Sequence, residues 1–187
     1  MLWLILAFRR LFFWGVIFGA VVFAIKNFPD RFQEAAMAFR EGRYDQAVVV
    51  WSKMARGGHA EAQYNLGALY AAGLGVPHSP EKAHDWFMKA ADACNPAAEF
   101  EAGKDFEYGR GTEQDIAKAV TFIARSAENG YAPAQIDLGL RYLSGAGLRK
   151  NTDKALYWLQ RATGPDRAPP VLYVGTPVGA EGDCDGN

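Results

Sequence analysis

Apolar side chains recur along residues 60–167 at the spacing of amphipathic helices. At the start of this stretch Ala62, Leu66, Leu69 and Tyr70 stand at relative positions i, i+4, i+7 and i+8. Side chains at these intervals lie on one face of an α-helix. The pattern therefore predicts a helix whose apolar face packs against a neighbour.

A second helix is predicted after a loop that contains two glycines. Gly73 stops the first helix, because glycine adopts the left-handed conformation of a helix end without a steric penalty. Ser79 can cap the second helix, and Pro80 suits its first turn, where no backbone N–H is required. The apolar stripe of the second helix consists of Ala83, Trp86, Phe87, Ala90 and Ala91. This mixture of small and large side chains is what two closely crossing helices need.

The helix pair recurs without a gap at a constant interval of 36 residues. Gly67, Gly103 and Gly139 occupy the same place in successive copies. A glycine in the middle of a helix costs about 1 kcal/mol relative to alanine, so close packing of a second helix must offset it. Repeats of this length are typical of stacked helical units. The three copies are residues 60–95, 96–131 and 132–167.

The first copy resembles a Sel1-like repeat, a relative of the tetratricopeptide repeat with a longer loop between its helices. The residues that carry the resemblance are Ala62-Gln63, Leu66-Gly67, Tyr70, Gly73, Gly75, Lys82-Ala83 and Trp86. The third copy keeps nearly all of them, and the second departs at Glu99, Ala102, Asp105 and Phe122. The resemblance implies an all-α fold, a right-handed superhelix of stacked helix pairs.

Residues 29–59 resemble an ordinary tetratricopeptide unit, because the spacing from Gly42 to Ala47 is half that of the later loops. Asp30 and Gln33 offer a capping box for its first helix. The predicted organisation is therefore one tetratricopeptide-like pair at 29–59, followed by three Sel1-like repeats at 60–163.

A membrane segment is predicted before the repeats. Residues 11–25 form an uninterrupted apolar run. As a helix this run would span roughly 22 Å of a hydrocarbon core of about 30 Å. Continuing it to Phe28 adds a turn, and Lys26 can extend its amine to the headgroups. We favour an uncleaved signal anchor over residues 1–28; the alternatives are a cleaved signal peptide and a buried core helix.

The charges that flank this segment indicate its orientation. Arg9 and Arg10 precede the run and favour an N-terminus in the cytoplasm. Basic residues on the other flank weaken that bias; they are Lys26, Arg31, Arg40 and Arg43. We expect a single-pass protein of a bacterial inner membrane, with its repeats in the periplasm rather than in the cytoplasm.

The composition argues against nucleic-acid binding and against metal chemistry. Lys and Arg number 20 against 21 Asp and Glu, so the chain lacks the basic excess of a nucleic-acid surface. Three histidines and two cysteines leave little material for a zinc site or a disulfide scaffold, and Cys94 is interpreted as a small buried residue. No nucleophile and base stand at a fixed spacing. We expect no enzymatic activity, cofactor, metal or small-molecule substrate; the enzyme-class alternative is an envelope hydrolase.

The resemblance implies a concave face that is lined by the first helix of each pair and binds a protein or peptide. The predicted partner-binding residues are Tyr64, Asn65, Phe100, Lys104, Glu107, Ile136 and Leu140. Tyr64, Phe100 and Ile136 form an apolar row that would anchor the partner. The competing interpretation is that this row packs against the preceding second helix, and that the charges form a solvated face. We expect a membrane-anchored adaptor or scaffold; the alternative is a structural homo-oligomer of the cell envelope.

Residues 164–187 break the repeat pattern. They are rich in Pro and Gly and carry an acidic excess, a composition that predicts disorder. One apolar segment, Val171-Leu172-Tyr173-Val174, interrupts this stretch. We expect it to dock on the exposed end of the third repeat or in the concave groove.

Overall fold

The computed structural model describes residues 31–164, and in this part of the chain every regular element is an α-helix. The helices are α2 (Arg31–Arg40), α3 (Tyr44–Arg56), α4 (Ala60–Ala72), α5 (Pro80–Asp92), α6 (Pro96–Tyr108), α7 (Ile116–Glu128), α8 (Ala132–Ser144) and α9 (Thr152–Thr163). Each packs mainly against the helices before and after it in the sequence. The prediction of an all-α repeat solenoid is therefore confirmed.

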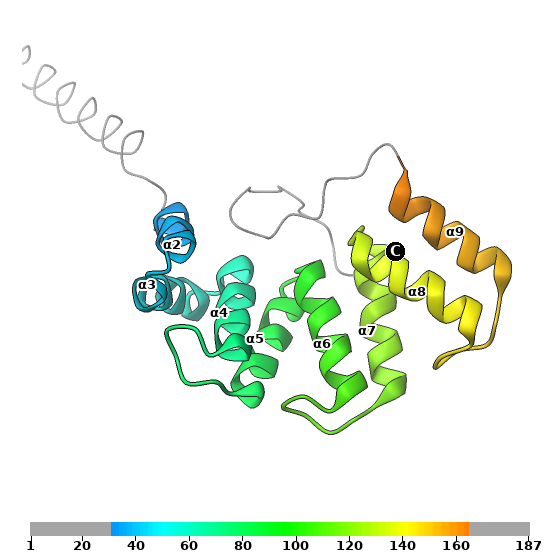
Figure 1. The fold of residues 1–187 in the computed structure, drawn as a ribbon, viewed down its shortest axis with the longest axis horizontal. Helices are drawn as coiled ribbons and strands as arrows, with labels where there is room; N and C mark the ends of the chain where they lie inside the picture. Colours follow the sequence, from blue (N-terminus) through cyan, green and yellow to red (C-terminus); the bar gives the residue numbers. More distant parts are fainter. Residues whose placement is uncertain (1–30, 165–187) are drawn as a thin grey trace, which may run out of the picture.

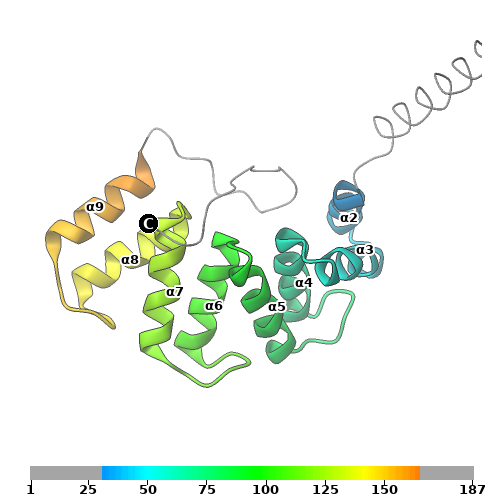
Figure 2. The ribbon, with the colours of Figure 1, turned by 180° about the vertical axis from the view of Figure 1, so that it is seen from behind.

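The helices form a curved array of four hairpins (Figures 1 and 2). The long loops at 73–79, 109–115 and 145–151 lie along the outer edge of the curve. The short turns at 57–59, 93–95 and 129–131 lie along its inner edge, as does the C-terminal end of α9. We call this side the inner edge below.

The two helices of each Sel1-like repeat approach one another at a glycine. A Cβ atom added at Gly67 would lie 2.7 Å from the Phe87 ring and 3.2 Å from the Ala83 carbonyl oxygen. A Cβ at Gly103 would lie 2.8 Å from Ile123 Cγ1, and one at Gly139 would lie 2.8 Å from Leu159 Cγ. Carbon atoms in ordinary contact stand about 3.5–4.0 Å apart, so no larger residue fits at these places. The predicted reason for the repeated glycine, close approach of a second helix, is confirmed.

The predicted helix starts are also confirmed. Ser79 accepts a hydrogen bond from the Lys82 N–H at 3.3 Å, and Pro80 begins α5. Asp115 accepts from the Lys118 N–H at 3.0 Å in the next repeat. These side chains satisfy backbone donors that have no partner within the helix.

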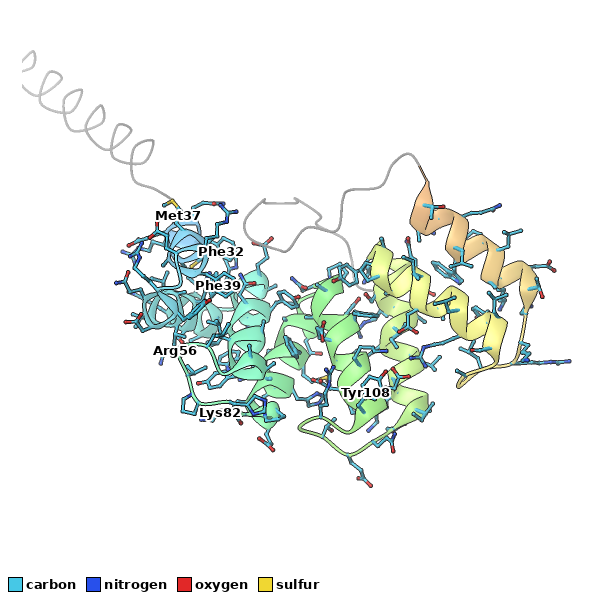
Figure 3. The ribbon with its side chains drawn as sticks, in the orientation of Figure 1. Phe32, Met37, Phe39, Arg56, Lys82 and Tyr108 are labelled. Carbon is cyan, nitrogen blue, oxygen red and sulfur yellow. The ribbon has the colours of Figure 1, made fainter. Side chains whose placement is uncertain are left out.

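Buried alanines recur throughout the core, and its largest cluster of bulky side chains lies at the N-terminal end. Phe32 of α2, Trp51 of α3 and Leu66 of α4 are buried in one cluster. Figure 3 shows Phe32 and Phe39 on the side of α2 that faces α3, with Met37 pointing away from the array. The tetratricopeptide-like pair thus shares a continuous core with the first Sel1-like repeat.

The turn that holds Cys94 differs from its two counterparts. The same position is Gly58 in the preceding turn and Gly130 in the following turn, with φ of 88° and 85°. Cys94 has φ of 59°, a conformation that costs a residue with a Cβ atom about 1–2 kcal/mol. Its side chain is half-buried and disulfide-bonded, so the interpretation of Cys94 as a small buried residue is wrong.

Several predictions concern residues outside 31–164. They are the membrane segment at 11–28, the cap at Asp30 and the disordered tail with its apolar segment at 171–174. Within the described range, none of the helices combines the length and the apolar character that crossing a bilayer requires.

The glycine contact makes a prediction about stability. Gly103→Ala should lower the free energy of unfolding by about 1–3 kcal/mol, because the new methyl group overlaps Ile123 and has the Ala119 carbonyl only 3.1 Å away. Urea denaturation measures the change. As a control, Thr121→Ala on the exposed side of α7 should alter it by less than about 0.5 kcal/mol. A Gly103→Ala protein as stable as the wild type would contradict the close contact.

Candidate functional site

The first helices of the Sel1-like repeats, α4, α6 and α8, carry the predicted binding residues. The nine corresponding positions are Tyr64, Phe100 and Ile136, then Ala68, Lys104 and Leu140, then Ala71, Glu107 and Leu143. We call these nine positions the first-helix face. The three copies of the face differ in exposure and chemistry.

The α8 portion of this face is an exposed apolar stripe. Ile136, Leu140 and Leu143 stand at i, i+4 and i+7 and expose 37%, 52% and 46% of their surface. Single exposed apolar residues are ordinary on protein surfaces, but three in line on one helix are typical of an interaction site. Two of the predicted binding residues, Ile136 and Leu140, belong to this stripe.

The predicted residues Lys104 and Glu107 belong to a closed ring of four charges between α6 and α8. Lys104 Nζ lies 2.6 Å from Glu107 Oε2 and 3.1 Å from Asp137 Oδ2. Arg141 completes the ring, with Nη2 at 2.7 Å from Glu107 Oε1 and Nε bonded to Asp137 Oδ1. All four side chains are largely buried, so the ring joins the second repeat to the third and is not a solvated face.

Hydrogen bonds within the ring favour the charged forms of Lys104 and Glu107. Burial alone would raise the pKa of Glu107, but the hydrogen bonds from Lys104 and Arg141 outweigh it and hold that pKa below its ordinary value. Burial alone would lower the pKa of Lys104, but its bonds to Glu107 and Asp137 raise it. A partner would thus meet donors and acceptors that already have partners within the ring.

The remaining predicted residues lie deeper. Tyr64 is half-buried, with its ring centroid 5.8 Å from that of Phe87 on α5. Phe100 is half-buried against Tyr131, at 5.6 Å between centroids. Asn65 is buried, and its side-chain Nδ2 has no hydrogen-bond partner. Tyr64 and Phe100 are therefore packed into the array, whereas the first-helix face is open at α8.

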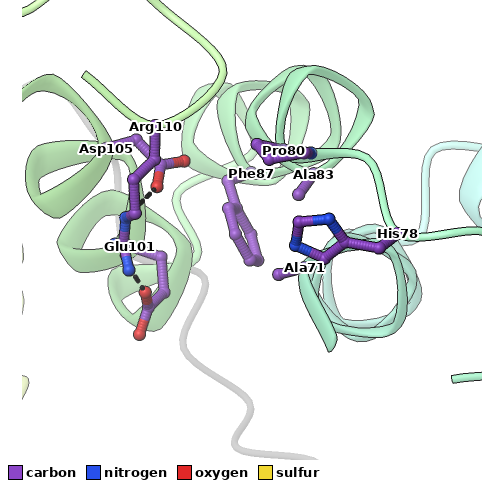
Figure 4. A pocket seen from close by; sticks show the side chains of 8 residues that line it. All are labelled: Ala71, His78, Pro80, Ala83, Phe87, Glu101, Asp105 and Arg110. Atoms are coloured by element: carbon purple, nitrogen blue, oxygen red, sulfur yellow. Dashed lines mark ion pairs between the residues drawn. The ribbon is translucent and has the colours of Figure 1, made fainter. Parts of the chain in front are cut away.

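A small cavity of roughly 100 Å³ lies between the first and second Sel1-like repeats (Figure 4). The cavity exists because Ala71 has a small side chain. The corresponding positions of the next two repeats are the larger residues Glu107 and Leu143. Arg110 stands between two carboxylates on its wall, 3.0 Å from Asp105 and 3.6 Å from Glu101. The cavity is lined by Ala71, His78, Pro80, Ala83, Phe87, Glu101, Asp105 and Arg110.

The charged side chains around the cavity pair with one another. Burial is the main cause that raises the pKa of Glu101, and Arg110 opposes it only in part. His84 Nδ1 lies 3.2 Å from Asp105 Oδ2, so the buried histidine pairs across the repeat junction. Arg110 lies between Glu101 and Asp105 and pairs with both carboxylates. The cavity lining contains no hydroxyl or thiol nucleophile.

The junctions between repeats share one buried hydrogen bond. Gln63 donates from Nε2 to the Ala55 carbonyl at 3.0 Å, and Gln135 donates in the same way to Ala127 at 3.0 Å. Both bonds tie the first helix of a repeat to the end of the preceding helix. The corresponding position of the middle repeat is Glu99, which cannot donate as a carboxylate.

Arg125 restores the missing bond. Its Nη2 donates to the Ala91 carbonyl at 3.1 Å, the acceptor that a glutamine would have used. Its Nε also contacts Glu99 Oε1 at 2.6 Å, and Asn129 donates to Glu99 Oε2 at 2.9 Å. Burial nevertheless dominates and raises the pKa of Glu99, against the opposing effect of Asn129 and Arg125. The departure of the second copy from the repeat pattern is thus compensated locally.

Sequence reasoning missed the basic residues that complete these clusters. Arg141 is buried at the position that is Leu69 in the first repeat and Asp105 in the second. Aligning the three repeats at their interval of 36 residues shows this change from an apolar to an acidic to a basic residue at one position. Within the described range, no three or more His, Cys, Asp or Glu residues are grouped to hold a metal ion.

Comparison with known proteins agrees with this geometry. The Sel1 repeat family model matches residues 60–93, 96–131 and 132–163. The crystal structure of a Sel1 repeat protein from Oxalobacter formigenes is similar, with 29% identity, a TM-score of 0.68, and a match covering 71% of this chain and 54% of that one. So is that of a protective antigen present in uropathogenic Escherichia coli strains, which displays an SLR fold. Its identity is 28%, its TM-score is 0.65, and the match covers 71% of this chain and 29% of that one. The chain thus spans about half of the first protein and less than a third of the second.

Glu99 predicts a specific pH dependence. Its pKa is higher in the folded than in the unfolded chain, so the folded state binds more protons as the pH falls toward the ordinary value of 4.5. As the pH falls from neutral to about 4.5, the free energy of unfolding of the wild type should therefore rise relative to that of Glu99→Gln. Urea denaturation at a series of pH values measures the difference.

The matched control for this experiment is Glu113→Gln, in the exposed loop between α6 and α7. It should leave stability within about 0.5 kcal/mol of the wild type throughout. If the free energies of unfolding of the wild type and Glu99→Gln differ by a constant amount across this pH range, burial does not raise the pKa of Glu99.

Proposed function

Because this chain belongs to the Sel1 repeat family, we propose that it is a membrane-anchored adaptor that binds a partner protein or peptide through its first-helix face. Sel1 repeat proteins are generally non-catalytic scaffolds and typically mediate protein–protein interactions. Family membership supports the scaffold role alone. The proposed binding surface and membrane anchor rest on the features described next.

The exposed stripe on α8 is the observation that carries the binding proposal. Ile136, Leu140 and Leu143 present an apolar line with the period of a helix, next to the charge ring formed by Lys104, Glu107, Asp137 and Arg141. Such a line suits the apolar face of an amphipathic helix or alternate side chains of an extended peptide. The ring is satisfied internally, so apolar contact supplies most of the affinity, and the charges fix the surface around it.

Tyr108 extends the surface toward the outer edge. It is largely exposed at the C-terminal end of α6 (Figure 3), and Lys104 Nζ lies 5.0 Å from its ring centroid. An aromatic ring that is held by a cation on one side and open to solvent on the other can cover a partner at low entropic cost. The proposed surface therefore runs from Ile136 through Leu140 to Leu143 and Tyr108.

A structural homo-oligomer is the second candidate, and one observation favours it. Leu156 and Tyr157 of α9 are exposed, whereas the residue that corresponds to Leu156 in the first repeat, His84, is buried against the next helix. The last repeat thus presents a stacking surface that another copy of the chain could cover.

Site-specific crosslinking separates these candidates. A photoreactive phenylalanine analogue at Leu140 of the full chain, in native membranes, should capture one discrete partner protein. The same residue at Val49, which is 70% exposed on α3, should not capture it. Identical products from both positions, or none from Leu140, would argue against a first-helix binding face; capture of a second copy would favour the homo-oligomer.

The contribution of the stripe itself can be measured with the photoreactive residue at Leu143. Combining it with Leu140→Ser should reduce the yield of the partner crosslink at least about fivefold, as expected where an anchoring side chain is removed. Val49→Ser is the matched control and should leave the yield unchanged.

Membrane anchoring through residues 11–28 rests on the apolar run in the sequence. The full chain should resist alkaline carbonate extraction, whereas residues 29–187 expressed alone should be released. Protease added to spheroplasts should digest the repeats if they lie in the periplasm. A mature protein whose mass lacks the N-terminal segment would instead support a cleaved signal peptide.

A further inference from the structure

The disulfide at Cys94 carries an inference about the same α8 stripe that the proposed function uses, although it does not rest on that function. Cys94 is disulfide-bonded, and the chain contains one other cysteine, Cys184. We propose that Cys94 and Cys184 form an intramolecular disulfide that fastens the C-terminal segment on the inner-edge side of the array, with Val171–Val174 against Ile136 and Leu140, the part of the α8 stripe nearer that edge.

The ends of this connection lie on the same side of the molecule. The turn between α5 and α6, which holds Cys94, is on the inner edge, and so is the end of α9 (Figures 1 and 2). Between them lie α8, α7 and α6, or roughly 30–40 Å at the usual 8–10 Å between packed helices. The chain from Gly164 to Cys184 has about 20 residues and reaches at most roughly 66 Å. It is therefore long enough to pass the third and second Sel1-like repeats and reach Cys94.

The backbone at Cys94 is consistent with a residue kept for its thiol. Gly58 and Gly130 occupy the corresponding places in the other two turns, where a positive φ favours glycine. Cys94 takes up the same conformation with a φ of 59° despite its Cβ atom. No demand of the turn explains a cysteine there, whereas a covalent bond to a distant segment does.

The C-terminal segment contains an apolar stretch that would cover the α8 stripe. Val171-Leu172-Tyr173-Val174 stands near the middle of the connection and is its most apolar stretch. Helix α8 lies between the two fastened ends, and its stripe begins at Ile136 near the inner edge and continues through Leu140 to Leu143 toward the outer edge. A segment tethered at both ends meets this surface at a high effective concentration, so even weak apolar contacts are occupied.

Formation of the bond is a two-electron oxidation. Each thiol loses its proton, the sulfur atoms of Cys94 and Cys184 join, and two electrons pass to the disulfide of a thiol–disulfide oxidoreductase. That disulfide is thereby reduced to two thiols. Such oxidants work outside the reducing cytosol, so an intact bond also favours placement of the repeats in the periplasm.

Peptide mapping tests the connectivity. Purified full-length chain, blocked with N-ethylmaleimide and digested without reductant, should yield one linked pair of peptides that contains Cys94 and Cys184. The pair should be two hydrogen atoms lighter than the separate peptides. Maleimide on both cysteines, or a Cys94–Cys94 bond between two chains, would overturn the proposal.

Stability measurements test whether the bond fastens the segment. Cys184→Ser and Cys94→Ser should each lower the thermal midpoint by on the order of 5 °C, with no further loss in the double variant. Reductant should lower the wild-type midpoint equally and leave Cys184→Ser unchanged. A Cys184→Ser protein that melts with the wild type would overturn the fastening.

Crosslinking of the purified chain tests the docking site. The photoreactive residue at Leu140 should react within the same chain at the peptide that holds Val171–Val174. This product should disappear in Cys184→Ser and be absent when the photoreactive residue is at Val49. Its absence from the oxidised wild-type background would overturn the docking. Because this experiment contains no partner, it can fail while partner capture in membranes succeeds, and the reverse.

Discussion

The close approach of the two helices within each repeat is the contact on which the rest of the structure depends. At Gly67, Gly103 and Gly139 the first helix has no side chain, so the second helix comes within contact distance of its backbone. Dispersion between closely packed atoms falls off steeply with separation, so this contact favours one spacing of the pair. The space left by each glycine is filled by one large side chain of the second helix, Phe87, Ile123 or Leu159. The charged clusters of this chain lie instead at the junctions between repeats.

The junctions add a second constraint through one buried hydrogen bond. Gln63 and Gln135 donate to the end of the preceding helix, and Arg125 supplies the same bond where the middle repeat has Glu99. An unsatisfied buried carbonyl would cost about 1–3 kcal/mol, so keeping the bond matters more than which residue provides it. The middle repeat gives up a neutral donor for a buried ion pair, and the added charge makes its stability depend on pH.

The repeat register predicted the fold because each local signal agreed with the others. Glycine, alanine and cap positions recur every 36 residues, and backbone geometry converts that recurrence into stacked pairs. The site was harder to predict, because the exposure of a first-helix residue depends on the adjacent repeats. Asn65 is buried and Leu140 is exposed, although both were assigned to one binding face. Lys104 belongs to a ring whose other basic member, Arg141, is 37 residues away. The register did contain a signal at Cys94, since both counterparts in the other turns are glycine.

Chemical differences between the junctions oppose incorrect stacking of similar repeats. One position changes from Leu69 to Asp105 to Arg141, and each residue meets a partner suited to it. If α8 packed where α6 belongs, Arg141 would face His84 in place of Asp105, and Glu107 would lose one of its two cations. Removing one partner of a buried ion pair is far more costly than the pair is stabilising. The charge ring and the hydrogen bond between His84 and Asp105 therefore oppose an exchanged order of the repeats. The exposed α8 stripe takes part in neither junction, so substitutions there should leave the order of the repeats unchanged.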